Sequence, residues 1–110
     1  IILSQAVTYL AASAKSNAAY MAINNAAEAV RNGGDLTVPL HLRNAPTKLM
    51  KDIGYGKEYQ YSHGYENNCS NQEFLPESIK GMKFYEPGNN AREKEMREYL
   101  KRLWGNKYNY

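Results

Sequence analysis

The chain has 110 residues, enough for one domain with one core that buries roughly two-thirds of its unfolded surface. Its formal charge of +3 comes without the dense lysine and arginine blocks typical of nucleic-acid-binding tails, and the single cysteine, Cys69, excludes a disulfide framework and a Cys/His zinc site. No apolar run is long enough to span a bilayer, so we expect a soluble protein with no membrane contact in a reducing compartment, the cytoplasm.

The first element expected is an amphipathic helix. The chain begins Ile1-Ile2-Leu3, without a methionine and already inside an apolar pattern, so we expect a fragment of a longer protein with no signal peptide at this start. Apolar residues then recur at spacings of three and four, which predicts a helix from about Ile2 to Ala14.

A second helix follows the break at residues 15–17. Ser16 or Asn17 is placed to cap it, and it should run to about Asn32, where Gly33-Gly34 ends it. We expect the two helices to form a helical hairpin.

The second helix is rich in alanine on more than one face, which suggests that two of its faces are covered, by a neighbouring helix or by another subunit. Simple helix propensity explains the alanines equally well. The candidate residues of an oligomer interface are Ala19, Ala22, Ile23 and Ala26.

Residues 38–56 are the part of the chain densest in special conformational preferences. Asn44 or Ala45 is predicted to end a loop, Pro46 to enter the first turn of a short helix, and Gly54 to close that helix in the left-handed conformation. We expect structural roles in this loop for Pro39, His41, Asn44, Pro46, Gly54 and Gly56.

Tyrosines mark the next segment. The chain has ten tyrosines against two phenylalanines, and such rings favour wet edges or hydrogen-bond partners. If the segment is extended, Tyr59, Tyr61, His63 and Tyr65 share one face. Residues 64–71 then read as a polar loop with no core-forming content.

The C-terminal third is predicted to return to the core. Residues 74–77 should start a helical turn that ends near Gly81, and Asn90 with Glu93 forms a capping box for a helix from about Ala91 to Trp104. One face of that helix carries its apolar residues, and alternating charges cover the others: a pattern typical of a solvated surface.

No catalytic arrangement is found. The chain lacks a P-loop, a dinucleotide fingerprint and a paired-histidine metal motif, and residues 54–57 are explained better as a helix C-cap than as a phosphate loop. No serine, cysteine or carboxylate lies beside His41 or His63 in a recognisable nucleophile arrangement, and Cys69 has no nearby cation to activate it. We expect no catalytic residue, no cofactor and no metal in this part of the protein.

Binding to DNA is the alternative function. The candidate contacts combine cations and rings as single-stranded nucleic-acid surfaces do: Arg43, Lys48, Lys51, Lys57, Tyr59 and Tyr61. The favoured interpretation is structural, with two lysines on the solvent face of a helix whose Leu49, Met50 and Ile53 face inward. In this interpretation Arg43 bonds loop carbonyls or the Glu77 carboxylate.

Several segments together carry a family resemblance: Lys15-Ser16-Asn17-Ala18-Ala19-Tyr20, residues 38–51 with His-Leu-Arg-Asn-Ala-Pro-Thr, Gly54-Tyr55-Gly56, Tyr59 with Tyr61 and His63, Phe74-Leu75-Pro76-Glu77, and Phe84-Tyr85-Glu86-Pro87. They resemble the C-terminal region of the replication-associated recombination protein A family, also called MgsA or RarA. That family is related to the Werner-helicase-interacting protein. Its members are AAA+ ATPases and clamp-loader relatives that act at stalled replication forks.

The resemblance implies a helical collar domain that assembles the protein into a homotetramer. It also implies that ATP and Mg belong to an ATPase module outside this sequence, and that DNA and replication-fork proteins are partners of the full-length protein. It transfers no role to residues 64–71 or to the tail, residues 105–110. Our prediction is one all-α domain over residues 1–110, a compact bundle of about five helices, that serves as a non-catalytic oligomerisation domain.

Overall fold

All regular structure in the chain is helical. The computed structural model describes residues 1–110, and its four α-helices are α1 (Ile2–Ala12), α2 (Ala18–Asn32), α3 (Lys48–Ile53) and α4 (Ala91–Trp104). Four short 3₁₀ turns lie between α2 and α4: η1 (Leu40–Leu42), η2 (Ser62–Gly64), η3 (Glu66–Asn68) and η4 (Glu77–Ile79). The predicted all-α class is confirmed, with four α-helices and four turns in place of about five helices. None of the helices is long and apolar enough to cross a bilayer.

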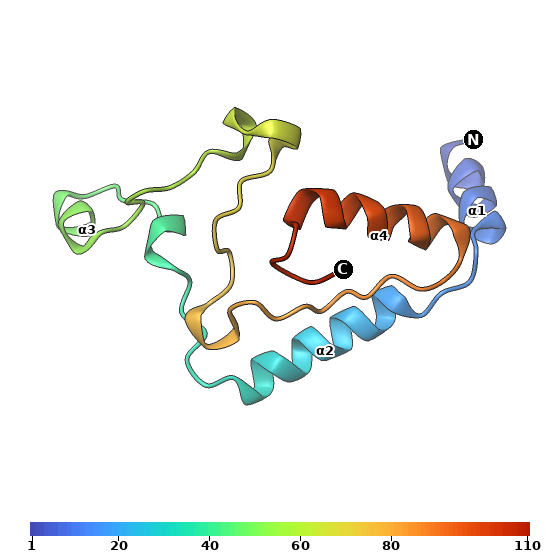
Figure 1. Ribbon diagram of the computed structural model, residues 1–110, viewed down its shortest axis with the longest axis horizontal. Helices are drawn as coiled ribbons and strands as arrows, with labels where there is room; N and C mark the ends of the chain where they lie inside the picture. Colours follow the sequence, from blue (N-terminus) through green and yellow to red (C-terminus); the bar gives the residue numbers. More distant parts are fainter.

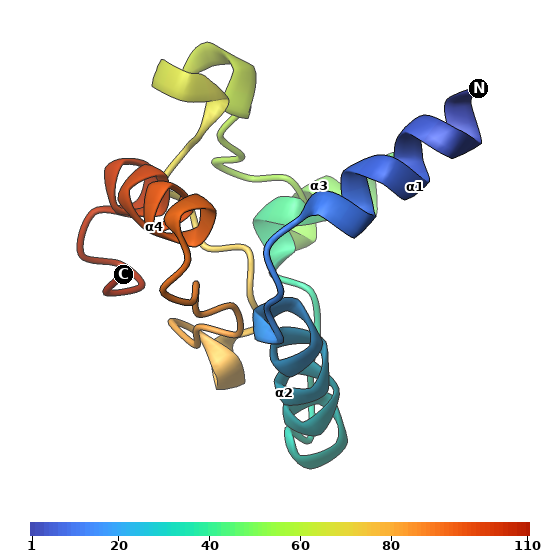
Figure 2. The same cartoon turned by 90° about the vertical axis from the view of Figure 1, so that its right-hand side faces the viewer.

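The helices form an open arrangement. The radius of gyration is 17.9 Å and the longest dimension 53 Å, whereas a closed domain of this length has a radius of gyration of about 13 Å. No two of the α-helices pack closely along their lengths. Figure 1 shows α1 and α3 at opposite ends of the molecule, and Figure 2 shows α1 pointing away from the rest of the chain.

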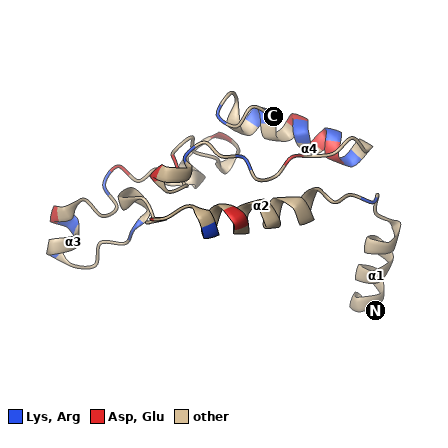
Figure 3. Ribbon diagram, turned by 90° about the horizontal axis from the view of Figure 1, so that it is seen from below, with Lys and Arg blue, Asp and Glu red and all other residues tan.

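The predicted hairpin of the first two helices is wrong. α1 ends at Ala12, because Ser13 is extended (φ −73°, ψ 146°), and α1 then leaves α2 at a steep angle (Figure 3). The connection is held elsewhere, since the Ser16 hydroxyl donates to a Glu93 carboxylate oxygen of α4 at 2.8 Å. The same hydroxyl oxygen accepts from the Ala18 amide at 3.1 Å, so Ser16 caps α2 and the Asn17 side chain does not.

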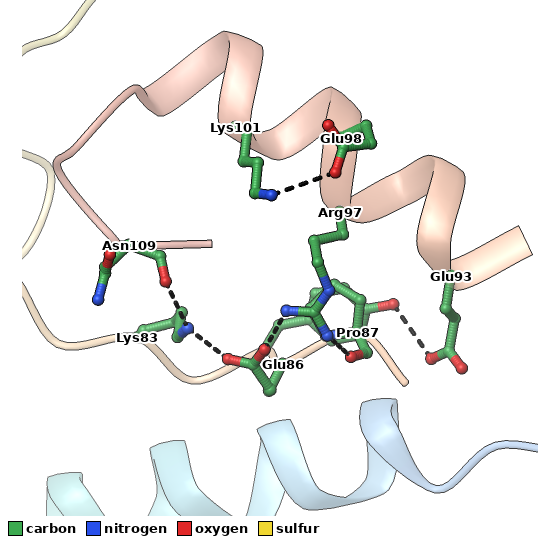
Figure 4. Close-up of polar contacts among 9 residues, drawn as sticks. Lys83, Glu86, Pro87, Glu93, Arg97, Glu98, Lys101 and Asn109 are labelled. Carbon is green, nitrogen blue, oxygen red and sulfur yellow. Dashed lines mark hydrogen bonds and ion pairs between the residues drawn. The ribbon is translucent and has the colours of Figure 1, made fainter. Parts of the chain in front are cut away.

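The segment between η4 and α4 runs along α2 and is tied to both of its ends. Ser78 donates to the Asp35 carbonyl at 3.2 Å, just beyond the C-terminus of α2, and Glu93 holds Ser16 at the N-terminus. Arg97 of α4 bonds the Glu86 carboxylate and the Pro87 carbonyl, and Pro87 is fully buried (Figure 4). Polar contacts at and beside the segment between η4 and α4 therefore join α2 to α4.

The C-terminal helix has the predicted bounds. The Asn90 side-chain oxygen accepts from the Glu93 amide at 3.0 Å, which is the first half of a capping box. The Glu93 carboxylate accepts from the Asn90 side-chain amide at 2.6 Å, where a standard box would use the backbone N–H of the capping residue. Gly105 ends the helix.

The segment around the tyrosines contains no strand. The 3₁₀ turn η2 takes up His63, so the alternating face predicted for an extended chain is interrupted, although the rings of Tyr61 and His63 still lie 5.2 Å apart. The prediction that residues 64–71 contribute nothing to the interior is also wrong. Ser70 is buried, and Gln72, just beyond, clamps residue 60 through both of its backbone groups.

Candidate self-association surface

The first helix carries no charge and is almost wholly exposed. Residues 1–14 contain no charged side chain, as the uncoloured α1 of Figure 3 shows. Ile2 and Leu3 are each 82% exposed and Leu10 is 71% exposed. Burial of one such large side chain is worth about 1.5–3 kcal/mol, so an exposed group of them is a candidate site of protein contact.

The second helix has two unlike faces. Its less exposed residues, Ala18, Ala22, Ala26 and Ala29, recur at spacings of four and three and so form one stripe. Small side chains allow close approach by a neighbouring segment. The stripe lies on the side of α2 approached by the segment that is tied to both ends of this helix. The larger groups are free: Tyr20, Ile23 and Val30 are each more than half exposed.

The predicted interface residues of α2 are split between its two faces. Ala22 and Ala26 lie on the partly covered stripe, whereas Ala19 and Ile23 are exposed with the larger groups. The exposed faces of α1 and α2 together are called here the N-terminal apolar surface. A cleft of about 910 Å³ adjoins this surface, between the end of α1, the start of α2 and the start of α4.

Electrostatics at that cleft centre on Glu93. The hydrogen bond from Ser16 is the main cause that holds the pKa of this carboxyl below its ordinary value, with further bonds from Tyr85 and Asn90. The Tyr85 hydroxyl has its pKa raised by burial first and by the charge of Glu93 second. Glu93 therefore favours the anionic form, and its hydrogen bonds hold Ser16, Tyr85 and Asn90 together at the cleft.

The exposed area of the whole chain agrees with a covered surface. The chain exposes 8675 Å², whereas a closed monomer of its mass exposes about 6,200 Å². The excess, roughly 2,500 Å², exceeds what one partner contributes to a standard interface, about 800 Å².

The central loop, residues 38–56, is held together by hydrogen bonds within the chain. His41 Nε2 lies 2.7 Å from the Glu73 carbonyl oxygen, and the Gly56 amide donates to the Leu40 carbonyl at 2.8 Å. Gly56 has φ +70°, and a Cβ there would lie 3.3 Å from the Arg43 carbonyl oxygen, so glycine is needed. Pro39 begins η1.

The start of α3 corrects one prediction. Thr47 is the N-cap, with its hydroxyl oxygen accepting from the Met50 amide at 3.2 Å, and Pro46 precedes the cap instead of entering the first turn. Asn44 is exposed, and its side chain makes no hydrogen bond. Gly54 closes the helix in the left-handed conformation at φ 102°, as predicted.

The candidate DNA contacts are split by the structure. Arg43 turns inward, donating to the Val38 carbonyl at 2.7 Å and to the Tyr55 hydroxyl at 3.0 Å, so its predicted bond to loop carbonyls is confirmed and Glu77 is not its partner. The other five are exposed, and none of their cations is in an ion pair: Lys48, Lys51, Lys57, Tyr59 and Tyr61.

Of the three apolar residues of α3 predicted to face inward, only Met50 is partly buried. Leu49 and Ile53 are more than half exposed, because α3 stands at the tip of an arm with nothing packed against it. Nowhere in the chain do three or more His, Cys, Asp or Glu side chains gather in a group that could hold a metal ion.

Sequence reasoning missed the tail. Lys107 donates to the Gln72 carbonyl at 2.7 Å and pairs with Glu73 at 3.7 Å. Its only signal in the sequence was its place between Trp104 and Tyr108, whose rings lie 5.3 and 5.2 Å from its Nζ.

Comparisons with known proteins point to one family. The family described as MgsA AAA+ ATPase C terminal matches residues 1–104. Replication-associated recombination protein A of Coxiella burnetii is 46% identical over 107 residues, which cover 94% of this chain and 24% of that protein. The protein of the same name from Escherichia coli K12 is 43% identical, over 89% of this chain and 22% of its own length.

A eukaryotic relative extends the match. ATPase WRNIP1 of Dictyostelium discoideum is 46% identical over 83 residues, which cover 74% of this chain and 10% of that protein. The chain spans about a quarter of the length of its bacterial relatives. It belongs to the family of MgsA AAA+ ATPase C-terminal domains.

Proposed function

We propose that this region is a non-catalytic oligomerisation domain that assembles an AAA+ ATPase through its N-terminal apolar surface. The observation that carries the proposal is α1, a charge-free helix whose large side chains are exposed over most of their area. A helix that is apolar and uncovered in one copy is stable in water only where something buries it. A second copy brings the same surface in matching amount.

The wider role follows from the family. Relatives are named for replication-associated recombination, so the full-length protein is proposed to act in DNA replication, recombination and repair. ATP and Mg are then bound by the ATPase module outside this sequence. The homotetramer expected from the family resemblance agrees with an exposed area large enough for two neighbours per chain.

Light scattering on the 110-residue chain tests the proposal. The molar mass, measured from about 1 to 100 μM, should stay at several chains on dilution, because an interface of this area and apolarity associates at micromolar concentrations or below. A mass of one chain, 12.5 kDa, at every concentration would contradict self-association and assign the surface to another part of the longer protein.

DNA binding is the second candidate, favoured by three lysines without ion-pair partners near two exposed tyrosines. Affinity for single-stranded DNA should fall steeply with salt, because phosphate contacts release counterions. Replacing Lys48, Lys51 and Lys57 by Gln should flatten that salt dependence, whereas Lys15→Gln, on the linker between α1 and α2, should leave it unchanged. No binding at low salt would rule this candidate out.

A further inference from the structure

The tail beyond the family match folds back into a groove of the same chain. The family match ends at Trp104. Gly105 then turns the chain with φ +54° and ψ −123°, a conformation that in practice only glycine adopts. Tyr108 and Tyr110 of the tail line an open cavity of about 340 Å³ together with the apolar side chains of residues 74, 75, 82 and 84. Burial is the main cause that raises the pKa of both hydroxyls.

Lys107 is the polar centre of this contact. Its ammonium lies 5.2 to 6.0 Å from the ring centres of Tyr108, Trp104 and Phe74, and its side chain is only 16% exposed. It also donates to the Gln72 carbonyl at 2.7 Å and pairs with Glu73 at 3.7 Å. The three rings, the carbonyl and the carboxylate around this cation form a site that recognises an ammonium group specifically.

A second anchor holds the end of the tail. Lys83 donates to the Asn109 carbonyl at 3.2 Å, and the Tyr110 ring lies 4.8 Å from its Nζ. Lys83 is itself held by Glu86, which Arg97 of α4 also binds (Figure 4). The groove therefore has a fixed cation at one end and an acceptor pair at the other.

We propose that this groove, formed by residues 72–75 and 82–86, is a binding site for a peptide segment with the pattern Lys-Tyr-X-Tyr, and that residues 107–110 are its ligand within the same chain. Lys107 donates to the Gln72 carbonyl and pairs with the Glu73 carboxylate. The first tyrosine fills the apolar part beside Phe74 and the second stacks on Lys83. Glycine at position 105 is the hinge on which the ligand is attached.

The tether explains why the site is filled. A short flexible link gives an attached ligand an effective concentration in the millimolar range, so the tail outcompetes a free segment unless that segment is abundant or the tail is weakened. The same Lys-Tyr-X-Tyr segment of a second copy of this chain is bound when the resident tail is absent. No residue of α1 or α2 lines this groove, so the peptide-binding proposal and the proposed self-association are tested separately.

The test uses Trp104, the single tryptophan, as the reporter. In one variant of the 110-residue chain, Lys107, Tyr108 and Tyr110 are replaced by Ser, which empties the groove. A peptide with the sequence of residues 105–110, Gly-Asn-Lys-Tyr-Asn-Tyr, is then titrated while Trp104 fluorescence is followed. We expect saturable binding to this variant, and at least about tenfold weaker binding to the wild-type chain, whose own tail competes.

A control peptide distinguishes specific recognition from nonspecific binding. The peptide with methionine at the lysine position should bind about tenfold more weakly, since a hydrogen bond to a charged group is lost. The proposal is overturned if the emptied variant keeps its helix content and molar mass yet shows no saturable binding at millimolar peptide. Equal affinities of the two chains would overturn it as well.

If the triple variant loses helix content, Lys107→Met alone carries the test. It keeps the tail's apolar contacts and removes only the ammonium. The wild-type peptide should then bind this variant more tightly than the wild-type chain, and equal affinity would refute the proposal. Molar mass measured in the same samples shows whether self-association has changed, so the two proposals fail separately.

Discussion

The N-terminal helices and the C-terminal unit are stabilised in opposite ways. Residues 1–34 form two regular helices with large apolar side chains exposed. Residues 72–110 contain one helix, but aromatic, ionic and capping contacts close their tail, middle segment and α4 onto one another. Regular helices need only local hydrogen bonds, whereas burial of their faces needs a partner. The first region thus leaves its apolar faces uncovered within the chain, as the proposed self-association requires, whereas the second region is closed by its own contacts.

The largest expected effect is the loss of self-association through the first region. Leu10→Lys places a charge within the N-terminal apolar surface, and we expect association to weaken at least about thirtyfold, because an unpaired charge in a buried interface costs more than about 2 kcal/mol. Gln5→Lys, on another face of α1, is the matched control and should keep the oligomer. Light scattering and circular dichroism together measure mass and helix content; an unchanged mass for Leu10→Lys would exclude α1 from the interface.

Two neighbouring positions on α2 sharpen the same comparison. Ile23→Lys changes an exposed side chain and should lower the molar mass without loss of helix. Ala22→Lys falls on the partly covered stripe and should instead destabilise the single chain by about 1–3 kcal/mol, because a long side chain enters a close contact. Urea unfolding of both variants decides between the two effects. Equal behaviour would show that the two faces of α2 are not distinct.

A polar substitution should loosen the second region without touching the first. The Gln72 side chain is 8% exposed and accepts from the Gln60 amide at 3.1 Å while donating to the Gln60 carbonyl at 2.7 Å. Gln72→Ala leaves both backbone groups without a partner, so we expect a loss of about 2 kcal/mol in urea unfolding. Asn71→Ala, next to it and exposed, should lose less than about 0.5 kcal/mol. Similar losses for both would show that the clamp does not stabilise the loop.

The cap of α3 should give a smaller effect. Thr47→Ala removes the side-chain acceptor for the Met50 amide and is expected to cost about 1 kcal/mol. Asn44→Ala removes a side chain that bonds nothing and should be neutral. Amide hydrogen exchange over residues 48–53 measures both, and faster exchange in the Asn44 variant alone would return the capping role to Asn44.

The smallest expected effect is on pH dependence. Hydrogen bonds, first of all from Ser16, hold the pKa of Glu93 below the ordinary value of 4.5. The folded state therefore binds a proton less readily than the unfolded state, so this contribution to stability is present above about pH 4.5 and is lost as pH falls through the lowered pKa. Between about pH 5 and pH 3, the urea midpoint of the wild type should fall more than that of Glu93→Gln. Parallel curves would contradict this assignment.

Local signals were enough for the helices. The spacing of apolar residues in α1, the glycine after α2, the left-handed Gly54 and the Asn90 cap are each decided within a few residues, and the structure has all four. The inward bond of Arg43 to a loop carbonyl was also predictable, because donor and acceptor lie five residues apart. The family was recognisable from the same strings of residues.

Only the tertiary structure decided how those helices are arranged. α1 and α2 have all the residues of a hairpin, yet Ser13 is extended and the linker between them bonds Glu93 of α4, 77 residues from Ser16. In the same way Lys107 reaches Gln72 across 35 residues and gives a role to a tail and a polar loop that had none in the sequence. Helix formation depends on neighbours along the chain, whereas these contacts join residues whose distance in sequence carries no periodic pattern. The sequence by itself determined the helices and the apolar face of α1, and the long-range polar bonds determined that this face is left uncovered.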